Sequence, residues 1–417
     1  MEFKTLLNAR REQDADVEGI VRDIIASVRE RGDAALIEYT AKFDRMELTP
    51  EQIRVSADEI ASAVKQVSKK DLEALTLARD RIRSHHEKQL PQDTRYIDPI
   101  GVELGSKWTA IEAVGLYVPG GTASYPSSVL MNAVPAKVAG VDRVAMVVPT
   151  PDGVINPLVL AAASLAGVDE IYRIGGAQAV AALAYGTQTI QPVAKIVGPG
   201  NAFVATAKRQ VFGTVGIDMI AGPSEVLIVA DKDNNPDWIA LDLLAQAEHD
   251  VNAQSILITD SRDLASAVTE AVERQLKQLP RAEIAGASWR DFGTIILVPD
   301  LADAVPLTNQ IAAEHLEIAV DDPDAFFSQI RNAGAVFLGK YTPEAIGDYI
   351  GGSNHVLPTA RSARFSSGLS VLDFVKRTSI LRCGPEQLAE IGPAAVTLAE
   401  AEGLQAHGRS VSIRMNH

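Results

Sequence analysis

Apolar positions in the first hundred residues recur with the period of an α-helix. One stripe has the i, i+3, i+4 spacing of a helix with one buried face, and it consists of Val17, Ile20, Val21, Ile24, Ile25 and Val28. At residues 49–52, the sequence TPEQ places a threonine cap, a proline and a glutamine where a capping box needs them. The N-terminal part of the chain is therefore predicted to be helical.

From about residue 108, short apolar runs of strand length alternate with helical segments. The runs include VDRVAMVVPT, DEIYRIGG, AKIVGPG, EVLIVAD, AQSILITDS, GTIILVPD and AVFLG. A helix such as NPLVLAAASLAG lies between two of them, with Gly167 placed to end it. Because the strands are mostly apolar and helices separate them, the pattern predicts an α/β fold with parallel sheets covered on both faces.

The sheet pattern ends near residue 340. Residues 341–374 form a long segment rich in glycine and serine, and loops of this length in compact proteins tend to carry function. From residue 384 onward the pattern again predicts helix.

Composition narrows the class of protein. A chain of 417 residues is too long for one ordinary core and suggests two or three domains. The net charge of −15 argues against a nucleic-acid partner, and no apolar stretch has the length of a membrane span. The start of the chain lacks an apolar signal core, and the single cysteine, Cys383, excludes a disulfide within the chain, so we expect a cytoplasmic protein. A cysteine-based zinc site is excluded too, which leaves histidine, carboxylate and amide groups as metal ligands.

Four of the seven histidines stand beside a carboxylate or an amide. His85 and His86 lie in a charged helix and are interpreted as part of a solvated face, and His417 is the terminal residue. In LDLLAQAEHD, Gln246 and His249 are three positions apart and share one face of a helix. Glu248 lies between them in the sequence but points to nearly the opposite side of the helix. The pair could bind a metal ion, or it could be a hydrogen-bonded helix end.

Three further pairs are candidates for chemistry. Glu314 and His315 adjoin at a predicted helix-to-strand junction, where a glutamate and a histidine in one cleft provide bases for an alcohol and for water. A surface pair remains the alternative. Asp348 and His355 lie among glycines that allow close approach of a ligand, and Glu402 and His407 lie near the C-terminus.

Three glycine turns follow predicted strands and lead into helices: VPGGTASYPSS, IGGAQAV and VGPGNAF. Helix N-termini after such turns favour phosphate groups. None matches the G-x-G-x-x-G fingerprint, so a dinucleotide site and an ordinary strand-to-helix turn both remain open.

Several long blocks, in order along most of the chain, resemble the histidinol dehydrogenase family. They are GLYVPGGTASYPSSVLMNAVPAKVAGV, GGAQAVAALAYGT, VGPGNAFV, DMIAGPSEVLIVAD, LLAQAEHD, AAEHLEI, GDYIGGSNHVLPT and EAEGLQAHGRSVSIR. The resemblance implies a four-electron oxidation of L-histidinol through L-histidinaldehyde to L-histidine with two NAD⁺, the last step of histidine biosynthesis.

The resemblance also implies a role for individual residues. One zinc ion per subunit is expected on Gln246, His249, Asp348 and His407. The expected catalytic pair is Glu314 and His315. Substrate contacts are expected from Ser224, His355 and Glu402, together with the zinc ligands and His315. NAD contacts are expected from Tyr117, Gln178 and Asn201.

The same resemblance implies two Rossmann-like parallel-sheet domains, incomplete and without the usual glycine fingerprint, with helical segments at both ends. We expect residues 1–112 to be a helical part joined to an α/β domain of residues 226–368. A second α/β domain is expected over residues 113–225, and a helical tail over 369–417. The family is a homodimer with exchanged C-terminal tails, so Glu402 and His407 are expected to act in the partner's site.

One position departs from the family pattern: Ala313 stands where the family usually has proline before the glutamate, without removing a chemical group. Cys383 lies outside every matching block, so a cysteine thiolate is not expected in the aldehyde step. The alternatives are a relative that oxidises another small alcohol, a zinc hydrolase, and a non-catalytic α/β module that binds zinc.

Overall fold

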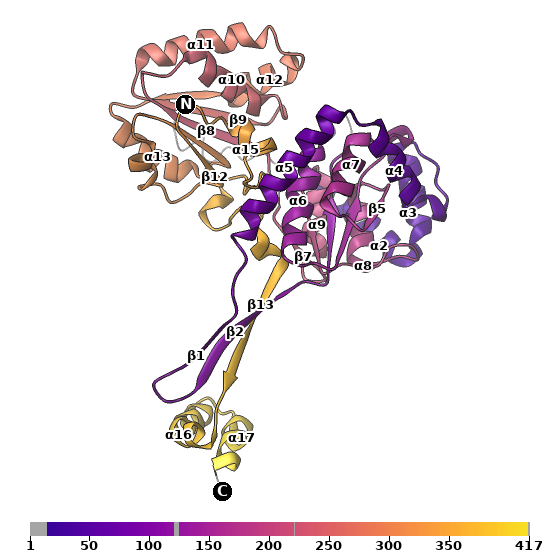
Figure 1. Cartoon of the computed structure of the whole chain (residues 1–417), viewed down its shortest axis with the longest axis vertical. Coiled ribbons are helices and arrows are strands. Elements are labelled where there is room, and N and C mark those ends of the chain that lie inside the picture. The colour runs from indigo at the N-terminus through magenta and orange to yellow at the C-terminus, as the bar shows by residue number, and fades with distance from the viewer. Residues whose placement is uncertain (1–14, 121–124, 221, 416–417) are drawn as a thin grey trace.

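The computed structural model describes residues 15–120, 125–220 and 222–415. Within them the chain forms two five-stranded parallel sheets and one three-stranded antiparallel sheet. Each parallel sheet, with the helices on its faces, forms a lobe, and the third sheet extends from the two lobes as a narrow arm (Figure 1). The predicted α/β class with two Rossmann-like sheets is confirmed.

The first parallel sheet has the strand order β5-β4-β3-β6-β7. Its strands are β3 (Ala113–Tyr117), β4 (Arg143–Val147), β5 (Glu170–Tyr172), β6 (Lys195–Val197) and β7 (Gly216–Ile217). The helices between them are α6 (Pro126–Val138), α7 (Pro157–Ala166), α8 (Gly176–Tyr185) and α9 (Ala202–Val211). Gly167 ends α7 in the left-handed conformation (φ 76°), as the sequence predicted.

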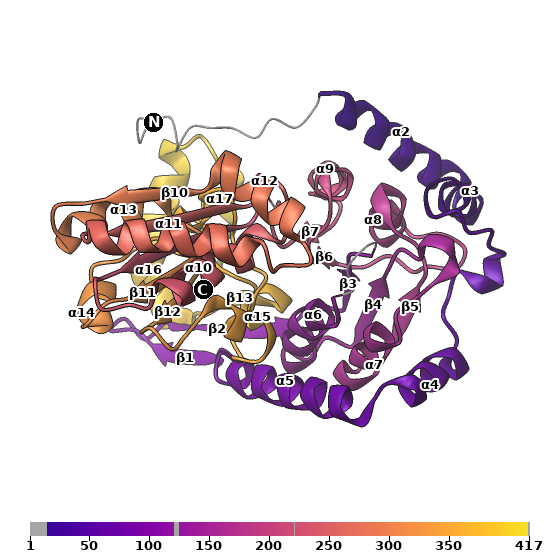
Figure 2. The same ribbon diagram turned by 90° about the horizontal axis from the view of Figure 1, so that it is seen from above.

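The N-terminal helices cover both faces of this first sheet (Figure 2). They are α2 (Ala15–Arg31), α3 (Asp33–Asp44), α4 (Ala57–Gln66) and α5 (Lys69–Glu87). Val21, Ile24 and Val28 of the predicted stripe are buried in one core with residues of α8 and α9, and α4 and α5 pack against α7 and α6. The expected attachment to the residue 226–368 domain is therefore wrong, because the apolar stripe is buried against the first sheet's helices.

The second parallel sheet repeats this topology with the order β10-β9-β8-β11-β12. Its strands are β8 (Glu225–Ala230), β9 (Gln254–Thr259), β10 (Thr294–Leu297), β11 (His315–Ala319) and β12 (Ala335–Leu338). Its helices are α10 (Pro236–Ala247), α11 (Arg262–Leu276), α12 (Ala282–Phe292), α13 (Ala304–Ile311), α14 (Pro323–Phe327) and the short α15 (Glu344–Tyr349). Short 3₁₀ turns lie at Pro50–Gln52, Pro151–Gly153, Leu301–Asp303, Ser362–Arg364 and Val371–Phe374.

The arm pairs two segments that lie far apart in the sequence. Strand β2 (Glu103–Ala110) runs antiparallel to both β1 (Thr94–Ile97) and β13 (Val375–Arg382). At its far end the arm carries α16 (Pro385–Ala401) and α17 (Gln405–Met415) (Figure 1). The terminal segments are mainly helical as predicted, but the expectation of helix alone was wrong at these three strands, because their partners are remote in sequence.

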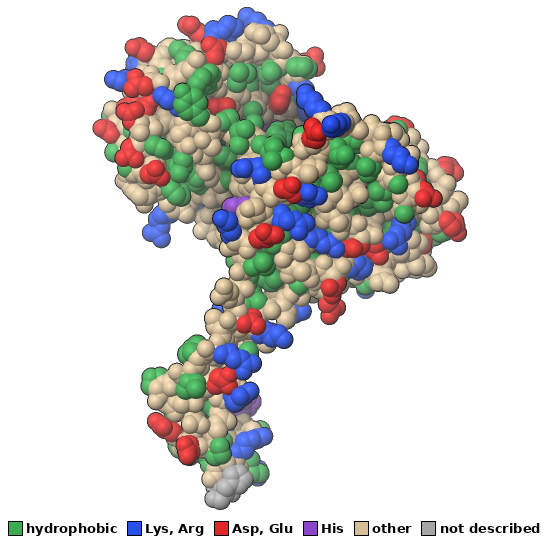
Figure 3. Space-filling view, in the orientation of Figure 1, with side chains coloured by type: hydrophobic (Ala, Val, Ile, Leu, Met, Phe, Trp, Pro, Cys, Tyr) green, Lys and Arg blue, Asp and Glu red, His purple; other side chains and the backbone are tan. Residues whose placement is uncertain are grey.

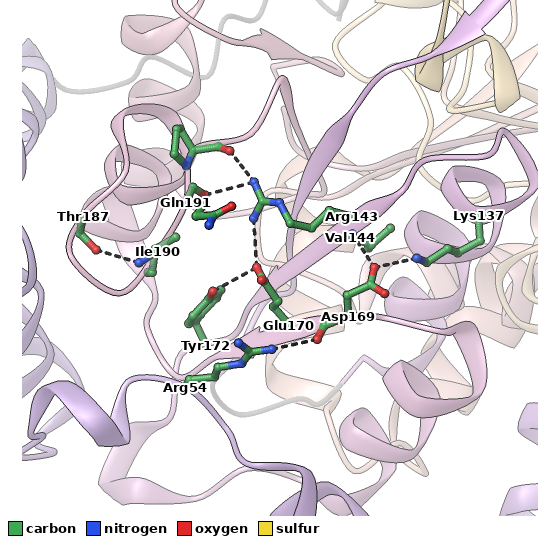
Figure 4. A network of polar contacts seen from close by, with 11 residues as sticks. Arg54, Lys137, Arg143, Val144, Asp169, Glu170, Tyr172, Thr187, Ile190 and Gln191 are labelled. Carbon is green, nitrogen blue, oxygen red and sulfur yellow. Dashed lines mark hydrogen bonds and ion pairs between the residues drawn. The ribbon is translucent and has the colours of Figure 1, made fainter.

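A polar network joins β4 to the start of β5 in the first sheet (Figure 4). Arg143 donates to the carboxylate of Glu170 at 3.0 Å, and the Tyr172 hydroxyl donates to the same carboxylate at 3.0 Å. Lys137 pairs with Asp169, whose carboxylate also accepts the backbone N–H of Val144 at 2.8 Å. None of these side chains lines the cleft described below.

Within the described residues, no helix combines the length and apolar character needed to cross a membrane.

Candidate active site

A cleft of about 1810 Å³ lies where the carboxyl edge of the first sheet faces the amino edge of the second. Tyr117 and Gly198 reach it from the ends of the neighbouring strands β3 and β6. Glu225 and His315, the first residues of β8 and β11, line the opposite side. The chain leaves β3 and β6 in opposite directions along the sheet, and this is the switch point at which doubly wound sheets bind ligands.

His315 is buried in the cleft, with 5% of its surface exposed. Its Nδ1 lies 3.1 Å from the carbonyl oxygen of Glu225. A carbonyl can only accept, so Nδ1 carries a hydrogen, and Nε2 has a lone pair whenever the imidazole is neutral. Nε2 is buried without a hydrogen-bond partner among the described residues and lies 3.6 Å from Oδ1 of Asp348. The imidazole therefore presents an unused basic nitrogen to the site.

Glu314 lies beside this imidazole and is also buried, with 5% exposed. Its Oε2 accepts the backbone N–H of Glu225 at 3.0 Å and lies 3.8 Å from Nδ1 of His315. Burial raises the pKa of the Glu314 carboxyl, against the opposing effects of His315, the Glu225 N–H and a hydrogen bond from Ser224. The helix α13 ends at Ala312 in the left-handed conformation (φ 51°), so no proline is needed to turn the chain toward Glu314.

Three carboxylates surround His315. Burial lowers the pKa of the imidazole, but Glu314, Glu344 and Asp348 outweigh it, and the net pKa lies well above the ordinary value. In return, the nearby imidazole of His315 outweighs the effect of burial and lowers the pKa of Asp348. The cluster therefore favours a positive charge on His315.

Glu344 is a site residue that the sequence analysis missed. Only 1% of it is exposed, and its Oε2 lies 3.7 Å from Nδ1 of His315 without a hydrogen-bond partner among the described residues. Its backbone N–H donates to Glu317 at 2.7 Å, and the Glu317 carboxyl hydrogen-bonds that of Asp242. Burial raises the pKa of Glu344 to about 8. The sequence around it shows only a helix start, so no local signal marks it.

Asp348, on α15, and His355, in the glycine-rich loop that follows α15, both line the cleft. Nδ1 of His355 donates to the carbonyl oxygen of Asp348 at 3.0 Å, and its Nε2 lies 3.2 Å from Oγ of Ser128. Burial lowers the pKa of His355, which favours the neutral imidazole. Gly347 allows this approach, since a Cβ there would collide with the Phe337 ring that stacks beside His315.

Gln246 and His249 reach the same cleft from the C-terminal end of α10, with Asp348 opposite them. Glu248 does not line the cleft, in agreement with the helix geometry. The described residues contain no group of three or more histidine, cysteine or carboxylate side chains arranged around a metal position. An imidazole and a carboxylate are nevertheless ligand types that suit zinc, and His249 and Asp348 supply them in this cleft beside the amide of Gln246.

Two expected site residues do not reach the cleft in this chain. Glu402 ends α16 and His407 lies on α17, and both are exposed. These helices stand at the far end of the arm, away from both lobes (Figure 1). A single subunit therefore brings together three of the four expected zinc ligands.

The three residues expected to contact NAD differ in position. Tyr117 and Asn201 line the cleft, and Gln178 is buried in α8 outside the described lining. The Tyr117 hydroxyl accepts the backbone N–H of Gly176 at 3.0 Å, and burial raises its pKa to about 12. The side-chain oxygen of Asn201 caps α9 by accepting the N–H groups of Phe203 and Val204.

Two doubly wound sheets with a carboxylate–imidazole pair at the cleft between them define an α/β enzyme with a dinucleotide-type switch point. Comparison with known proteins identifies which one. The model of the family described as histidinol dehydrogenase matches residues 7–415. The chain belongs to this family and is an NAD-dependent oxidoreductase.

Similar proteins span the whole chain. A histidinol dehydrogenase of Agrobacterium fabrum is 72% identical over 414 residues, which cover 99% of this chain and 96% of that protein. One of Mesorhizobium japonicum is 70% identical with the same coverage. The crystal structure of histidinol dehydrogenase from Elizabethkingia anophelis is 38% identical and superimposes with a TM-score of 0.96, covering 99% of this chain and 95% of that one.

Proposed function

We propose that the protein oxidises L-histidinol through L-histidinaldehyde to L-histidine with two NAD⁺, as the last step of histidine biosynthesis. The observation that carries this proposal is His315, whose Nδ1 is bound by the Glu225 carbonyl while Nε2 stays free in the cleft. Family membership favours this oxidation over the zinc hydrolase and the non-catalytic module.

In the first half-reaction, Nε2 of His315 takes the hydroxyl proton as the carbinol hydrogen leaves as hydride to the nicotinamide ring. The products are the aldehyde, NADH and an imidazolium. The surrounding carboxylates stabilise that positive charge, because they lie 3.6 to 3.8 Å from the ring nitrogens. The proton then passes to solvent before the second oxidation.

In the second half-reaction, water adds to the aldehyde carbon while Glu314 takes a proton from that water, and the Glu314 carboxyl then delivers this proton to the former carbonyl oxygen to complete the hydrate. The hydrate gives its carbon-bound hydrogen as hydride to a second NAD⁺, and His315 takes the hydroxyl proton, which leaves the carboxylic acid. Cys383 lies on the arm between β13 and α16, outside the described lining, which supports a route without a thiolate.

Gln246, His249 and Asp348 would hold zinc together with His407 from a second subunit. When bound, zinc supplies a Lewis acid that anchors the imidazole and amine of the substrate. Ser224 and His355 line the same cleft and would orient the substrate. Glu402 would arrive on the same exchanged tail as His407.

The dimer with exchanged tails is supported by apolar side chains exposed on the arm. Leu381, Leu398 and Ile413 are 67%, 64% and 68% exposed. Green side chains are visible over this end of the molecule (Figure 3). Such exposure on a small helical body indicates a contact with another subunit.

The single cysteine of the chain also suits the reducing cytoplasm in which we propose the enzyme acts.

At the first sheet, Tyr117 and Asn201 would contact NAD at the switch point, with Gln178 supporting them from α8.

The stoichiometry of the reaction tests the proposal most directly. Zinc-loaded protein receives limiting L-histidinol, and the NADH formed is measured by absorbance. Two NADH for each histidinol consumed are expected. Bound zinc and NAD⁺ without any reduction would contradict histidinol as the substrate and favour another small alcohol.

A further inference from the structure

A buried ion pair outside the predicted site lines the floor of the cleft. Lys208 lies on α9 and Asp218 follows β7, and their side chains are 3% and 1% exposed. Both line the cleft on the first-sheet side. Among the described residues, neither forms an ion pair or hydrogen bond with His315 or Asp348. The pair is therefore separate from the proposed catalytic and zinc-binding residues.

The pair holds both backbone polar groups of Gly198. Lys208 Nζ donates to the Gly198 carbonyl oxygen at 3.0 Å, and Oδ2 of Asp218 accepts the Gly198 N–H at 2.7 Å. Oδ1 of Asp218 accepts the N–H of Met219 at 2.7 Å and pairs with the Lys208 ammonium. One glycine is therefore held by two charged side chains. One comes from α9, which precedes β7 in the sequence, and the other comes from the residue that directly follows β7.

The position of this glycine matters for the cleft. Gly198 has a φ of 107°, and a Cβ there would collide with the carbonyl oxygen of Tyr117 at the end of β3. It begins the turn Gly198–Asn201, which leads from β6 into α9 at the switch point. Gly198, Pro199, Gly200 and Asn201 all line the cleft.

Burying a lysine and an aspartate costs free energy, and an apolar pair of similar volume would fasten α9 to the sheet as well. An apolar pair could not satisfy the N–H and carbonyl of Gly198, which lie in a turn outside the sheet's hydrogen-bond ladder. The charged pair thus determines the conformation of one turn rather than general stability.

We propose that Lys208 and Asp218 are positioning residues for the dinucleotide, which hold the Gly198–Asn201 turn in the conformation that receives NAD⁺. The inference rests on the proposed function for the identity of the ligand. The pair holds the turn through the backbone of Gly198, so we expect it to act on cofactor affinity and not on the chemical steps.

The test is the double variant Lys208→Met/Asp218→Asn, which removes both charges together and leaves no lone buried charge. We expect the NAD⁺ dissociation constant, measured by calorimetry without histidinol, to rise about tenfold. The KM for NAD⁺ is expected to rise in parallel, with kcat and the KM for histidinol within about twofold of the parent. An unchanged NAD⁺ affinity would overturn the proposal, and so would equal losses in all three kinetic constants.

The matched control is Arg143→Met/Glu170→Gln, which removes a pair in the same sheet away from the cleft (Figure 4). It should lower the melting temperature and leave NAD⁺ affinity unchanged; an equal loss of affinity would show a general structural effect and overturn the proposal. If the double variant does not fold, Asp218→Glu decides, since it keeps both buried charges but displaces the acceptor of the Gly198 N–H, and it should weaken NAD⁺ binding about threefold. NAD⁺ binding by parent protein that never oxidises histidinol would contradict the proposed function while leaving this inference intact.

Discussion

The carbonyl oxygen of Glu225 accepts a hydrogen bond from Nδ1 of His315 at 3.1 Å, and this contact selects the tautomer of the imidazole. The base thus depends on a backbone group from the neighbouring strand β8, and no substitution of the Glu225 side chain can remove that acceptor. The N–H of the same residue donates to Glu314, so one residue of β8 orients both members of the proposed catalytic pair.

Replacing Glu314 by glutamine should separate the two half-reactions. Glutamine keeps the shape and the acceptor for the Glu225 N–H but cannot take a proton from water. We expect turnover of histidinaldehyde to fall about 10²- to 10⁴-fold, the range typical of a lost general base, while the first NADH still forms. Glu273→Gln, on the exposed face of α11, is the control and should behave as the parent. Two NADH per histidinol from Glu314→Gln at the parental rate would refute the assignment.

Replacing His315 by asparagine should slow both half-reactions, because both require a base for a hydroxyl proton. In the parent, kcat/KM should rise with pH as Nε2 loses its proton, since the carboxylates raise the pKa of His315. The variant should lose this pH dependence along with about 10²- to 10⁴-fold in rate. A pH profile that keeps its parental shape in His315→Asn would assign the titration to another group.

Glu344→Gln should change how stability depends on pH. Burial raises the pKa of this carboxyl to about 8 in the folded state, above the unfolded value near 4.5. Between these values the folded state holds a proton that the unfolded state releases, so the group's contribution to stability falls as pH rises, by at most about 1.4 kcal/mol per pH unit. Metal-free Glu344→Gln should therefore gain stability over the parent from pH 5 to 8. Denaturant unfolding at several pH values measures the difference, and a constant difference would contradict the raised pKa.

Complementation between subunits tests tail exchange. His407→Ala should lack a zinc ligand and Glu314→Gln should lack the second half-reaction, so each homodimer is defective in histidine formation. If tails are exchanged, one site of a mixed dimer carries both defects and the other carries neither. Random mixing of the two variants should then restore about a quarter of the parental activity for histidine formation, since half of the dimers are mixed and each has one intact site. No recovery after verified subunit exchange would place His407 in the site of its own chain.

Both parallel sheets were predictable because their strands are mostly apolar and alternate with helices. The arm was not, because β2 is half-buried along its length and pairs with β13 from the other end of the chain. The proposed zinc ligands and catalytic residues were identified because long blocks of the sequence resemble the histidinol dehydrogenase family. The spacing of residues alone gave only candidate pairs. Glu344 and Lys208 lacked any local signal, since the sequence does not show that a charged residue on a helix will be enclosed by other segments.

The pairing of β13 with β2 also governs when the molecule can be completed. Every residue from Val375 to Arg382 pairs with a residue between Glu103 and Ala110, and all strands of both parallel sheets are encoded between them. During synthesis β2 can pair with β1 at once, but it lacks β13 until almost the entire chain has left the ribosome, so this contact of very high sequence separation forms late. Both parallel sheets can therefore form first, and the arm is completed only as the end of the chain is released.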